Sequence, residues 1–391
     1  MARHFETNYD TASVVAWLAD GARSAPESQD VLAELCVRLR ACGLPLWRVD
    51  VFVRTLHPEI KGRRFRWQEG HEVSVAIATF GPGRKSLVEH VCDSRKPIRE
   101  RPTDDKSQGE FPLLKKLWAE GVTELFATPL VFTTGDVHAA VWTTQQADGF
   151  TDEQIAGIEA VVKPLARVAE VRALQRTASN LLDTYVGSRT GKRILAGQIR
   201  RGHTELINAA IWLSDMRGFT SRSDQLPPQA MIDMLNRYFD CQVPSIIAHG
   251  GEVLKFMGDG LLAMFPIDSE SLAMETCAEA LAAGLETRAR IAALNSRETD
   301  ELQQIRFGLA LHVGDVLYGN IGGGNRLDFT CIGPAVNLAA RLEKIAAELG
   351  RTVVASSAFA AHFDSQLTSL GEFTVRGFGA QQTVFGLSDE A

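Results

Sequence analysis

The chain has 391 residues, a length that favours two globular units joined by a linker. An apolar content of 45%, a charged content of 23% and a net charge of −7 exclude a mainly disordered chain and argue against nonspecific binding to nucleic acid, which needs accumulated positive charge. No apolar run approaches the roughly 20 residues of a membrane helix. The first ten residues lack the apolar segment of a secretory signal, so we expect a cytoplasmic protein without a membrane span.

The cysteines show no CxxC pair and no matched histidine spacing, so we expect neither a zinc ribbon nor a disulfide framework. Buried free thiols are the favoured interpretation. The six positions are Cys36, Cys42, Cys92, Cys241, Cys277 and Cys331.

Residues 10–175 carry the pattern of a small α/β domain. Apolar residues recur at helical spacing over 28–42, and the segment 47–56 then alternates like a strand. The runs 126–132 and 137–145, separated by TTGD, predict a hairpin. This order loosely resembles a GAF-like domain, which implies a sensory or regulatory role and an unknown small ligand or signal.

A long amphipathic helix is predicted from about 152 to 187, with Thr151 as N-cap and Gln154 three positions further on. Two interpretations remain open for it: the last core helix of the first domain, or a signalling helix that runs towards the second half. Residues 184–203 are rich in Gly and Arg with a partly helical centre. They mark the domain boundary, within a helical linker that we place at 176–204.

From residue 205 to 388 the pattern alternates between helix and strand. A buried strand ends at Asp215, a helix follows over 227–251, and a hairpin around Gly-Asp-Gly follows over 252–265. We expect Pro244 to kink or end the helix. The later elements are a helix over 271–294, strands over 306–322 and 326–333, and a helix over 334–350. The order β-α-β-β-α-β predicts an α+β, ferredoxin-like core with added strands.

Two aspartates are candidates for a metal site. Asp215 stands where the buried strand stops, and Asp259 stands at the tip of the hairpin. In a ferredoxin-like core the first strand lies beside that hairpin, so both carboxylates can reach one edge of the sheet. Such hard oxygen ligands suit Mg²⁺ or Mn²⁺. Taken singly, each residue has a simpler interpretation: Asp259 as a turn residue and Asp215 as a helix cap.

Asn337 and Arg341 are spaced i,i+4 and therefore share a helix face, where an amide can orient a sugar and a guanidinium can stabilise phosphoryl charge. The alternative is a solvated surface pair. Lys255 stands on a strand with Val253 and Met257 on the same face, so its ammonium needs an anionic or acceptor partner. A role as strand-edge gatekeeper is the alternative for this lysine.

Together these elements fall in one order within one domain. The segments SDMRGFT, EVLKFMGDG and GNIGGGNRLDFTCIGPAVNLAARLE closely resemble class III adenylate and guanylate cyclases, over residues 205–388. The resemblance implies that Asp215 and Asp259 bind two Mg²⁺ or Mn²⁺ ions per active site, and it groups Met216 with them. It also implies that the loop around Gly218, Phe219 and Thr220 cradles the triphosphate.

The resemblance further implies that Lys255 and Thr330 read the base. Many family members carry Asp at the second position, and Thr resembles the bacterial branch similar to bicarbonate-responsive cyclases. Guanylate cyclases typically carry Glu and Cys at the two positions, and Cys331 is one residue out of register. A Lys donor and a Thr hydroxyl suit adenine, so we expect ATP as substrate. A guanylate cyclase and an inactive cyclase-like nucleotide-binding module are the alternatives.

By the same resemblance, Asn337 orients the ribose and Arg341 stabilises the transition state as the 3′ oxygen attacks the α-phosphorus and pyrophosphate leaves. Family members often place a Lys near the C-terminal strand to hold phosphates. Here Phe378 stands in the comparable place, so Arg376 is only a candidate for that contact. In the family the metal aspartates come from one subunit and the other groups from its partner. A homodimer with shared active sites is therefore expected.

Overall fold

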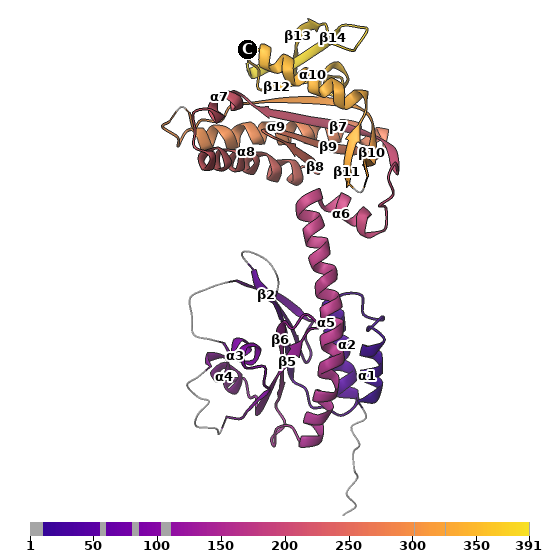
Figure 1. The fold of residues 1–391 in the computed structure, drawn as a ribbon, viewed down its shortest axis with the longest axis vertical. Coiled ribbons are helices and arrows are strands. Elements are labelled where there is room, and N and C mark those ends of the chain that lie inside the picture. The colour runs from indigo at the N-terminus through magenta and orange to yellow at the C-terminus, as the bar shows by residue number, and fades with distance from the viewer. Residues whose placement is uncertain are drawn as a thin grey trace, which may run out of the picture. The chain divides into compact units, whose positions relative to one another are not determined.

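The computed structural model describes residues 11–54, 60–79, 86–102, 111–300, 302–324 and 326–390. The chain divides into two compact units, residues 1–180 and 181–391 (Figure 1). Each unit has its own sheet and its own apolar core, and each is described separately below.

The first unit contains a six-stranded sheet in the order β3-β2-β1-β6-β5-β4. Its strands are β1 (Arg48–Arg54), β2 (Ile60–Gln68), β3 (Ser74–Thr79), β4 (Ile98–Glu100), β5 (Glu124–Val131) and β6 (Val137–Thr144). Its helices are α1 (Ala12–Ala19), α2 (Ser28–Ala41), α3 (Leu87–Ser94), α4 (Pro112–Ala119) and the greater part of α5 (Asp152–Val186), whose last residues belong to the second unit. The predicted helix over 28–42 and the β5–β6 hairpin are confirmed. The strand predicted over 47–56 is confirmed up to Arg54, and its last two residues lie outside the described residues.

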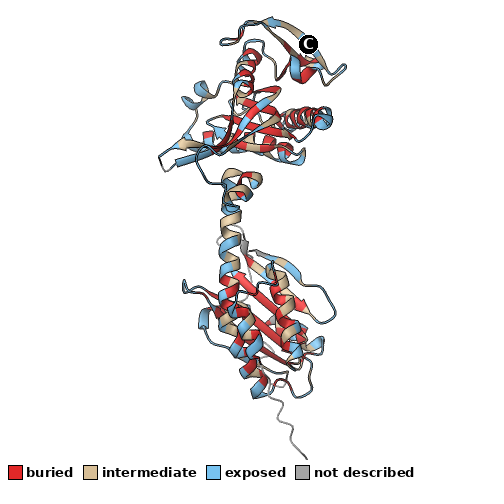
Figure 2. Cartoon of the chain, turned by 90° about the vertical axis from the view of Figure 1, so that its right-hand side faces the viewer, coloured by how far each residue is buried: buried red, intermediate tan, exposed pale blue. Residues whose placement is uncertain are grey.

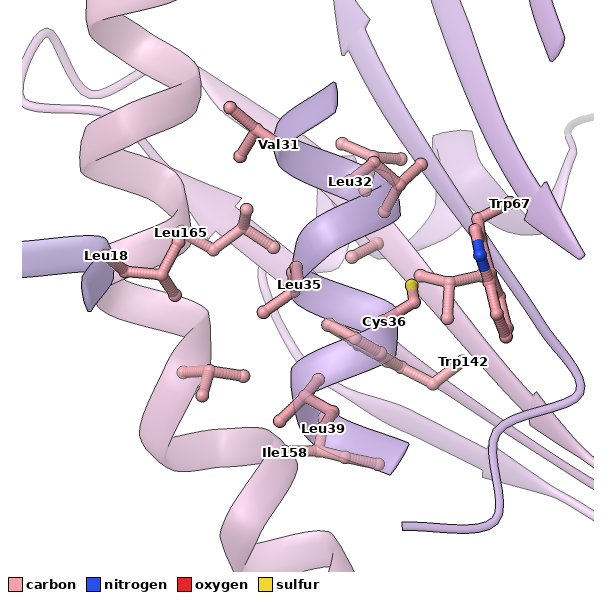
Figure 3. Packing of buried hydrophobic residues seen from close by; sticks show 14 of the residues in the cluster. Leu18, Val31, Leu32, Leu35, Cys36, Leu39, Trp67, Trp142, Ile158 and Leu165 are labelled. Carbon is pink, nitrogen blue, oxygen red and sulfur yellow. The ribbon is translucent and has the colours of Figure 1, made fainter. Parts of the chain in front are cut away.

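Strand β6 is buried on both faces, and its alternating side chains enter two separate cores. Trp142 points to the face covered by α1, α2 and α5, where it packs with Leu35, Leu39 and Ile158 (Figure 3). Val141 points to the opposite face, whose core includes residues of α3 and α4. Helices on both faces therefore close the sheet into one unit.

Helix α5 confirms the long helix predicted from about 152 to 187. Its start is capped as expected, because the Gln154 amide N–H donates to Thr151 Oγ1 at 3.2 Å and the Thr151 N–H donates to Gln154 Oε1 at 3.0 Å. Gly187, with φ of +83°, separates α5 from α6 (Ser188–Leu195). The partly helical centre predicted for the linker is thus α6.

The second unit contains an eight-stranded sheet, in which β11 pairs only with β10 and the other strands follow the order β13-β14-β12-β10-β7-β9-β8. Its strands are β7 (Thr204–Met216), β8 (Glu252–Met257), β9 (Gly260–Ile267), β10 (Phe307–Gly323), β11 (Arg326–Ile332), β12 (Val353–Ser356), β13 (Leu367–Phe373) and β14 (Gln382–Leu387). Its longer helices are α8 (Pro228–Ala248), α9 (Ala273–Asn295) and α10 (Pro334–Glu348), with short helices α7 (Phe219–Ser223) and α11 (Ser357–Ala360). The sequence β7-α8-β8-β9-α9-β10 is the predicted β-α-β-β-α-β order.

Strand β7 lies in the middle of this sheet, and its side chains pack into a separate core on each face. Trp212 packs on the side of α8 and α9, whereas Ile211 packs on the side of α10. The central strands of both units are accordingly buried (Figure 2). The end of β7 carries the first of the predicted site residues.

One of the two outcomes predicted for Pro244 does not occur. Helix α8 does not end at this proline but continues to Ala248. A proline removes a single i→i−4 hydrogen bond, and the apolar contacts of the flanking residues, such as Cys241 and Ile246 in the core, keep the segment helical.

The cysteines are all free, and five of the six are buried while Cys42 is half-buried, as the spacing predicted. Within the described ranges, no helix combines the length and the apolar character that crossing a bilayer would require.

Candidate active site

Asp215 stands at the end of β7 between two glycines of neighbouring strands. Gly308 of β10 is its partner in the β7–β10 ladder. On the other side, a Cβ atom on Gly260 of β9 would lie 3.3 Å from Asp215 Oδ1. The two small residues leave space beside the strand, and the carboxylate occupies the space on the β9 side.

Asp259 lies in the turn that joins β8 to β9, next to Gly258, whose φ of +70° permits the turn. Burial, followed by the negative charges of Asp259 and Glu343, raises the pKa of Asp215 to about 6. The structure therefore brings Asp215 and Asp259 together at one edge of the sheet, as the strand order predicted.

This pair of carboxylates suits a divalent cation by its donor chemistry. The oxygens are hard ligands, and burial together with the negative charges of Asp259 and Glu343 raises the pKa of Asp215, so a cation would relieve an unfavourable negative charge. Across the part of the chain that the structure describes, no group of three or more His, Cys, Asp or Glu side chains is arranged to hold a metal. A cation here would need further ligands from a substrate or from water. The Met216 side chain is buried in the core, so only its main chain is available to such a site.

Lys255 reaches the α10 side of the sheet because of a β-bulge. The β8–β9 register shifts between Val253 and Lys255, so strict alternation does not hold there. Val253 packs with the α8/α9 core, whereas the Lys255 ammonium lies 3.5 Å from Asp328 Oδ2 of β11. The prediction that Lys255 shares a face with Val253 is therefore wrong, whereas Met257 follows Lys255 in regular register and stays on its face. The predicted need for an anionic partner is met.

Thr330 stands on β11, two residues after Asp328. It is 3% exposed, and its hydroxyl is buried with no hydrogen-bond partner among the described residues. Such an unsatisfied polar atom is costly and therefore unusual in a folded core. Cys331 packs in the core beside Tyr318, its partner in the β10–β11 ladder. Burial raises the pKa of the Cys331 thiol to about 11.

Asn337 and Arg341 lie on α10, which begins at Pro334 as predicted. Asn337 is exposed and Arg341 is half-buried. The opposite side of α10 is anchored by Ala339 and Ala346, which are buried. The helix therefore presents the amide and the guanidinium from a firmly packed support.

The loop after Asp215 forms the five-residue helix α7. Gly218 is its N-cap, with φ of +71°, and Ser221 Oγ donates to the Gly218 carbonyl at 2.9 Å. Phe219 is half-buried against the α8/α9 core, and Thr220 is exposed. The predicted phosphate loop is thus a tight turn that begins directly beside the two aspartates.

The C-terminal segment offers no cation at the place where the family often has one. Phe378 packs against a core cluster of α10 and β12. Arg376 is exposed in the connection between β13 and β14.

Sequence reasoning missed two ion pairs at this site. One is Lys255 with Asp328. The other joins Arg217, in the loop after β7, to Glu343 on α10, with Arg217 Nη1 and Glu343 Oε1 at 2.5 Å. The acidic residues Asp328 and Glu343 both lie inside the motif segments. Their partners are distant in the sequence, so no local spacing of residues could have predicted either ion pair.

The geometry and the motifs define a class of domain. Residues 203–388 match the family model described as Adenylate and Guanylate cyclase catalytic domain. The site therefore belongs to an adenylate and guanylate cyclase catalytic domain, which confirms the class that the sequence motifs predicted.

Individual relatives agree with this class. The chain is 28% identical over 228 residues to Adenylate cyclase 1 of Rhizobium meliloti (strain 1021), covering 56% of this chain and 33% of that protein. It is 30% identical over 156 residues to Adenylate cyclase of Anabaena cylindrica, covering 40% and 31%. The chain thus spans about a third of the length of these curated relatives. A solved structure of a bacterial light-regulated adenylyl cyclase aligns with a TM-score of 0.50 at 20% identity over 71% of this chain and 88% of that one, a likeness of fold alone.

Proposed function

We propose that the chain is an adenylate cyclase that converts ATP to 3′,5′-cyclic AMP and pyrophosphate. The observation that carries the proposal is the pair of adjacent carboxylates, Asp215 and Asp259, beside a tight loop that suits a triphosphate. Two curated relatives named adenylate cyclase support the same activity.

Base recognition follows from the chemistry of Lys255 and Thr330. An ammonium donates to the ring nitrogens of adenine, and a hydroxyl accepts from its exocyclic amine. The orphaned Thr330 hydroxyl supports this role, because a buried polar atom without a partner is one that a ligand can satisfy. The Lys255 ammonium pairs with Asp328, which stands two residues before Thr330 on β11.

Asp215 and Asp259 would hold two Mg²⁺ or Mn²⁺ ions, whose positive charge would lower the pKa of the ribose 3′-hydroxyl and neutralise the departing pyrophosphate. Asn337 would orient the ribose. Arg341 would meet the negative charge that grows on the phosphoryl oxygens as the 3′ oxygen attacks the α-phosphorus in line with the leaving group. The chain forms no covalent intermediate in this scheme.

The active site is proposed to form between two copies of the chain. An exposed apolar row supports this assembly, since Leu206, Leu317 and Ile332 are neighbours across β7, β10 and β11 and are 68%, 41% and 45% exposed. Exposed apolar rows of this kind mark interaction surfaces. In the homodimer, one protomer would supply the aspartates and the other Lys255, Thr330, Asn337 and Arg341.

The first unit is proposed to be a GAF-like regulatory domain that takes an unknown small ligand or signal. A six-stranded sheet with helices on both faces supports this proposal.

The segment after α5 is tied into the catalytic unit by a buried polar cluster: Thr190 Oγ1 donates to Glu252 Oε1 at 3.1 Å, and the Tyr318 hydroxyl donates to Glu252 Oε2 at 3.1 Å. Because Glu252 starts the strand that carries Lys255, movement of α6 can reach the base-reading residues.

The test is a product assay on the purified full chain with Mn²⁺. Incubation with ATP is expected to give cyclic AMP and pyrophosphate at a rate well above that with GTP. Preferential formation of cyclic GMP would replace the proposal by a guanylate cyclase. Absence of either cyclic product, with nucleotide still bound, would indicate an inactive binding module.

A further inference from the structure

Arg217 follows Asp215 by two residues, yet its side chain is paired with α10. Its Nη1 donates to Glu343 Oε1 at 2.5 Å, and its Nη2 donates to the Glu343 carbonyl oxygen at 3.4 Å. The two side chains are only 24% and 8% exposed. Solvent therefore screens this pair less than a surface ion pair, and its geometry is well defined.

The Arg217 guanidinium lies beside the strand position opposite Asp215. Gly308 is the ladder partner of Asp215, and a Cβ atom built on Gly308 would overlap the guanidinium. A side chain at this position would have to displace the guanidinium. The positive charge of Arg217 is close enough to lower the pKa of Asp215, whereas the charge of Glu343 raises it.

A guanidinium in this place is a competitor for the metal-binding carboxylates. Arginine pairs readily with carboxylates through two parallel N–H donors, and such pairs use the same oxygens that a divalent cation needs. Glu343 offers Arg217 a different carboxylate, fixed on a helix whose buried residues Leu342 and Ala346 hold it against the sheet. The competitor is thereby held on α10.

We propose that Glu343 is a positioning residue that keeps Arg217 paired with α10 and so leaves Asp215 and Asp259 open to a divalent cation. The proposal rests on the proposed function, because it takes these aspartates as the metal ligands. The proposal also links the two half-sites that each protomer carries. The helix that restrains the loop after Asp215 is the same helix that carries Asn337 and Arg341.

The test measures binding of Mn²⁺ alone to the full-length protein, through the loss of the free-ion electron paramagnetic resonance signal. Glu343→Gln is expected to weaken Mn²⁺ binding at least tenfold, because the released Arg217 then pairs with the aspartates. The double variant Arg217→Gln, Glu343→Gln removes the competitor and is expected to restore binding to within about threefold of the unmodified chain. Arg217→Gln alone is expected to bind Mn²⁺ at least as tightly as the unmodified chain.

Glu298→Gln is the matched control. Glu298 pairs with Arg237 at 3.3 Å in the same unit, and the side chains of Glu298 and Arg237 are 25% and 34% exposed. Its Mn²⁺ binding is expected to be unchanged. A calorimetric unfolding trace for each variant checks that the protein is folded.

Three outcomes overturn the proposal. Equal Mn²⁺ binding by Glu343→Gln and the unmodified chain shows that no competitor was released. A double variant as weak as Glu343→Gln shows that the glutamate acts through structure alone. Weaker binding by Arg217→Gln shows that Arg217 supports the site, and this arm decides the matter even if Glu343→Gln does not fold. If the unmodified chain binds no Mn²⁺, the metal site of the proposed function fails as well.

Discussion

Asp215→Asn is expected to stabilise the metal-free protein at neutral and alkaline pH. In the folded chain, burial and the neighbouring carboxylates raise the pKa of Asp215 from 3.8 to about 6. An ionised Asp215 is therefore unfavourable in the folded state above pH 6, whereas the unfolded chain ionises it freely. Asparagine keeps the shape of the side chain and removes this charge.

The size of the effect follows from the pKa difference. At about 1.4 kcal/mol for each tenfold change in the proton equilibrium, the difference corresponds to about 3 kcal/mol. The carboxyl is partly open to solvent, which reduces the value to about 1.5 kcal/mol. For a unit of this size, such a gain raises the unfolding midpoint by about 3–6 °C.

The direction in which stability changes with pH follows from the link between proton binding and folding. A carboxyl whose pKa is raised by folding contributes stability that is complete below pH 3.8 and is lost as the pH rises through about 6. The advantage of Asp215→Asn should thus be full at pH 8 and vanish towards pH 4. Mn²⁺ should stabilise the unmodified chain at pH 8 and have little effect on the variant, because the ligand is missing.

Scanning calorimetry of the full chain in a chelator, at pH 4.5 and pH 8, with and without Mn²⁺, measures both effects. Only the transition of the catalytic unit should move. An Asp215→Asn midpoint equal to or below that of the unmodified chain at pH 8 would refute the idea that the two carboxylates repel each other in a partly buried site.

Three further outcomes are expected. Asp259→Ala and Arg341→Ala should each lower cyclic AMP formation by about 10²–10³-fold without lowering the unfolding midpoint by more than a few degrees, and wild-type turnover in either would remove that residue from the mechanism. Lys255→Glu combined with Thr330→Cys should shift the ratio of kcat/KM for ATP and GTP towards GTP; an unchanged ratio would show that these residues do not read the base. Thr190→Val should destabilise the catalytic unit by about 1–3 kcal/mol in calorimetry, because Glu252 loses a buried donor, and an unchanged midpoint would contradict the importance of that cluster.

The sequence predicted the convergence of Asp215 and Asp259 because it required only the order of elements. A buried strand, a helix and a hairpin in this order are typical of a ferredoxin-like core. The observed strand order β10-β7-β9-β8 places the first strand, β7, beside the β8–β9 hairpin. The helix that carries Asn337 and Arg341 was predictable for a similar reason, since Pro334 and Gly350 mark its two ends.

Other parts of the site could not be predicted. The bulge before Lys255 breaks the period of two, and nothing in EVLKFM distinguishes a bulged strand from a regular one. The ion pair of Arg217 with Glu343 joins positions 126 residues apart. The space beside Gly308 that the Arg217 guanidinium occupies forms only when β7 and β10 pair, so the sequence alone does not distinguish Gly308 from any other glycine in a strand.

The most direct test of the central claim mixes two inactive proteins. In the proposed mechanism, Asp215→Ala retains the nucleotide-reading half of the site and Arg341→Ala retains the metal-binding half. If each active site takes its aspartates from one protomer and its arginine from another, the mixture forms cyclic AMP from ATP, up to about a quarter of the wild-type rate when exchange is random. If the mixture stays as inactive as its components while both proteins exchange subunits, the shared site is contradicted.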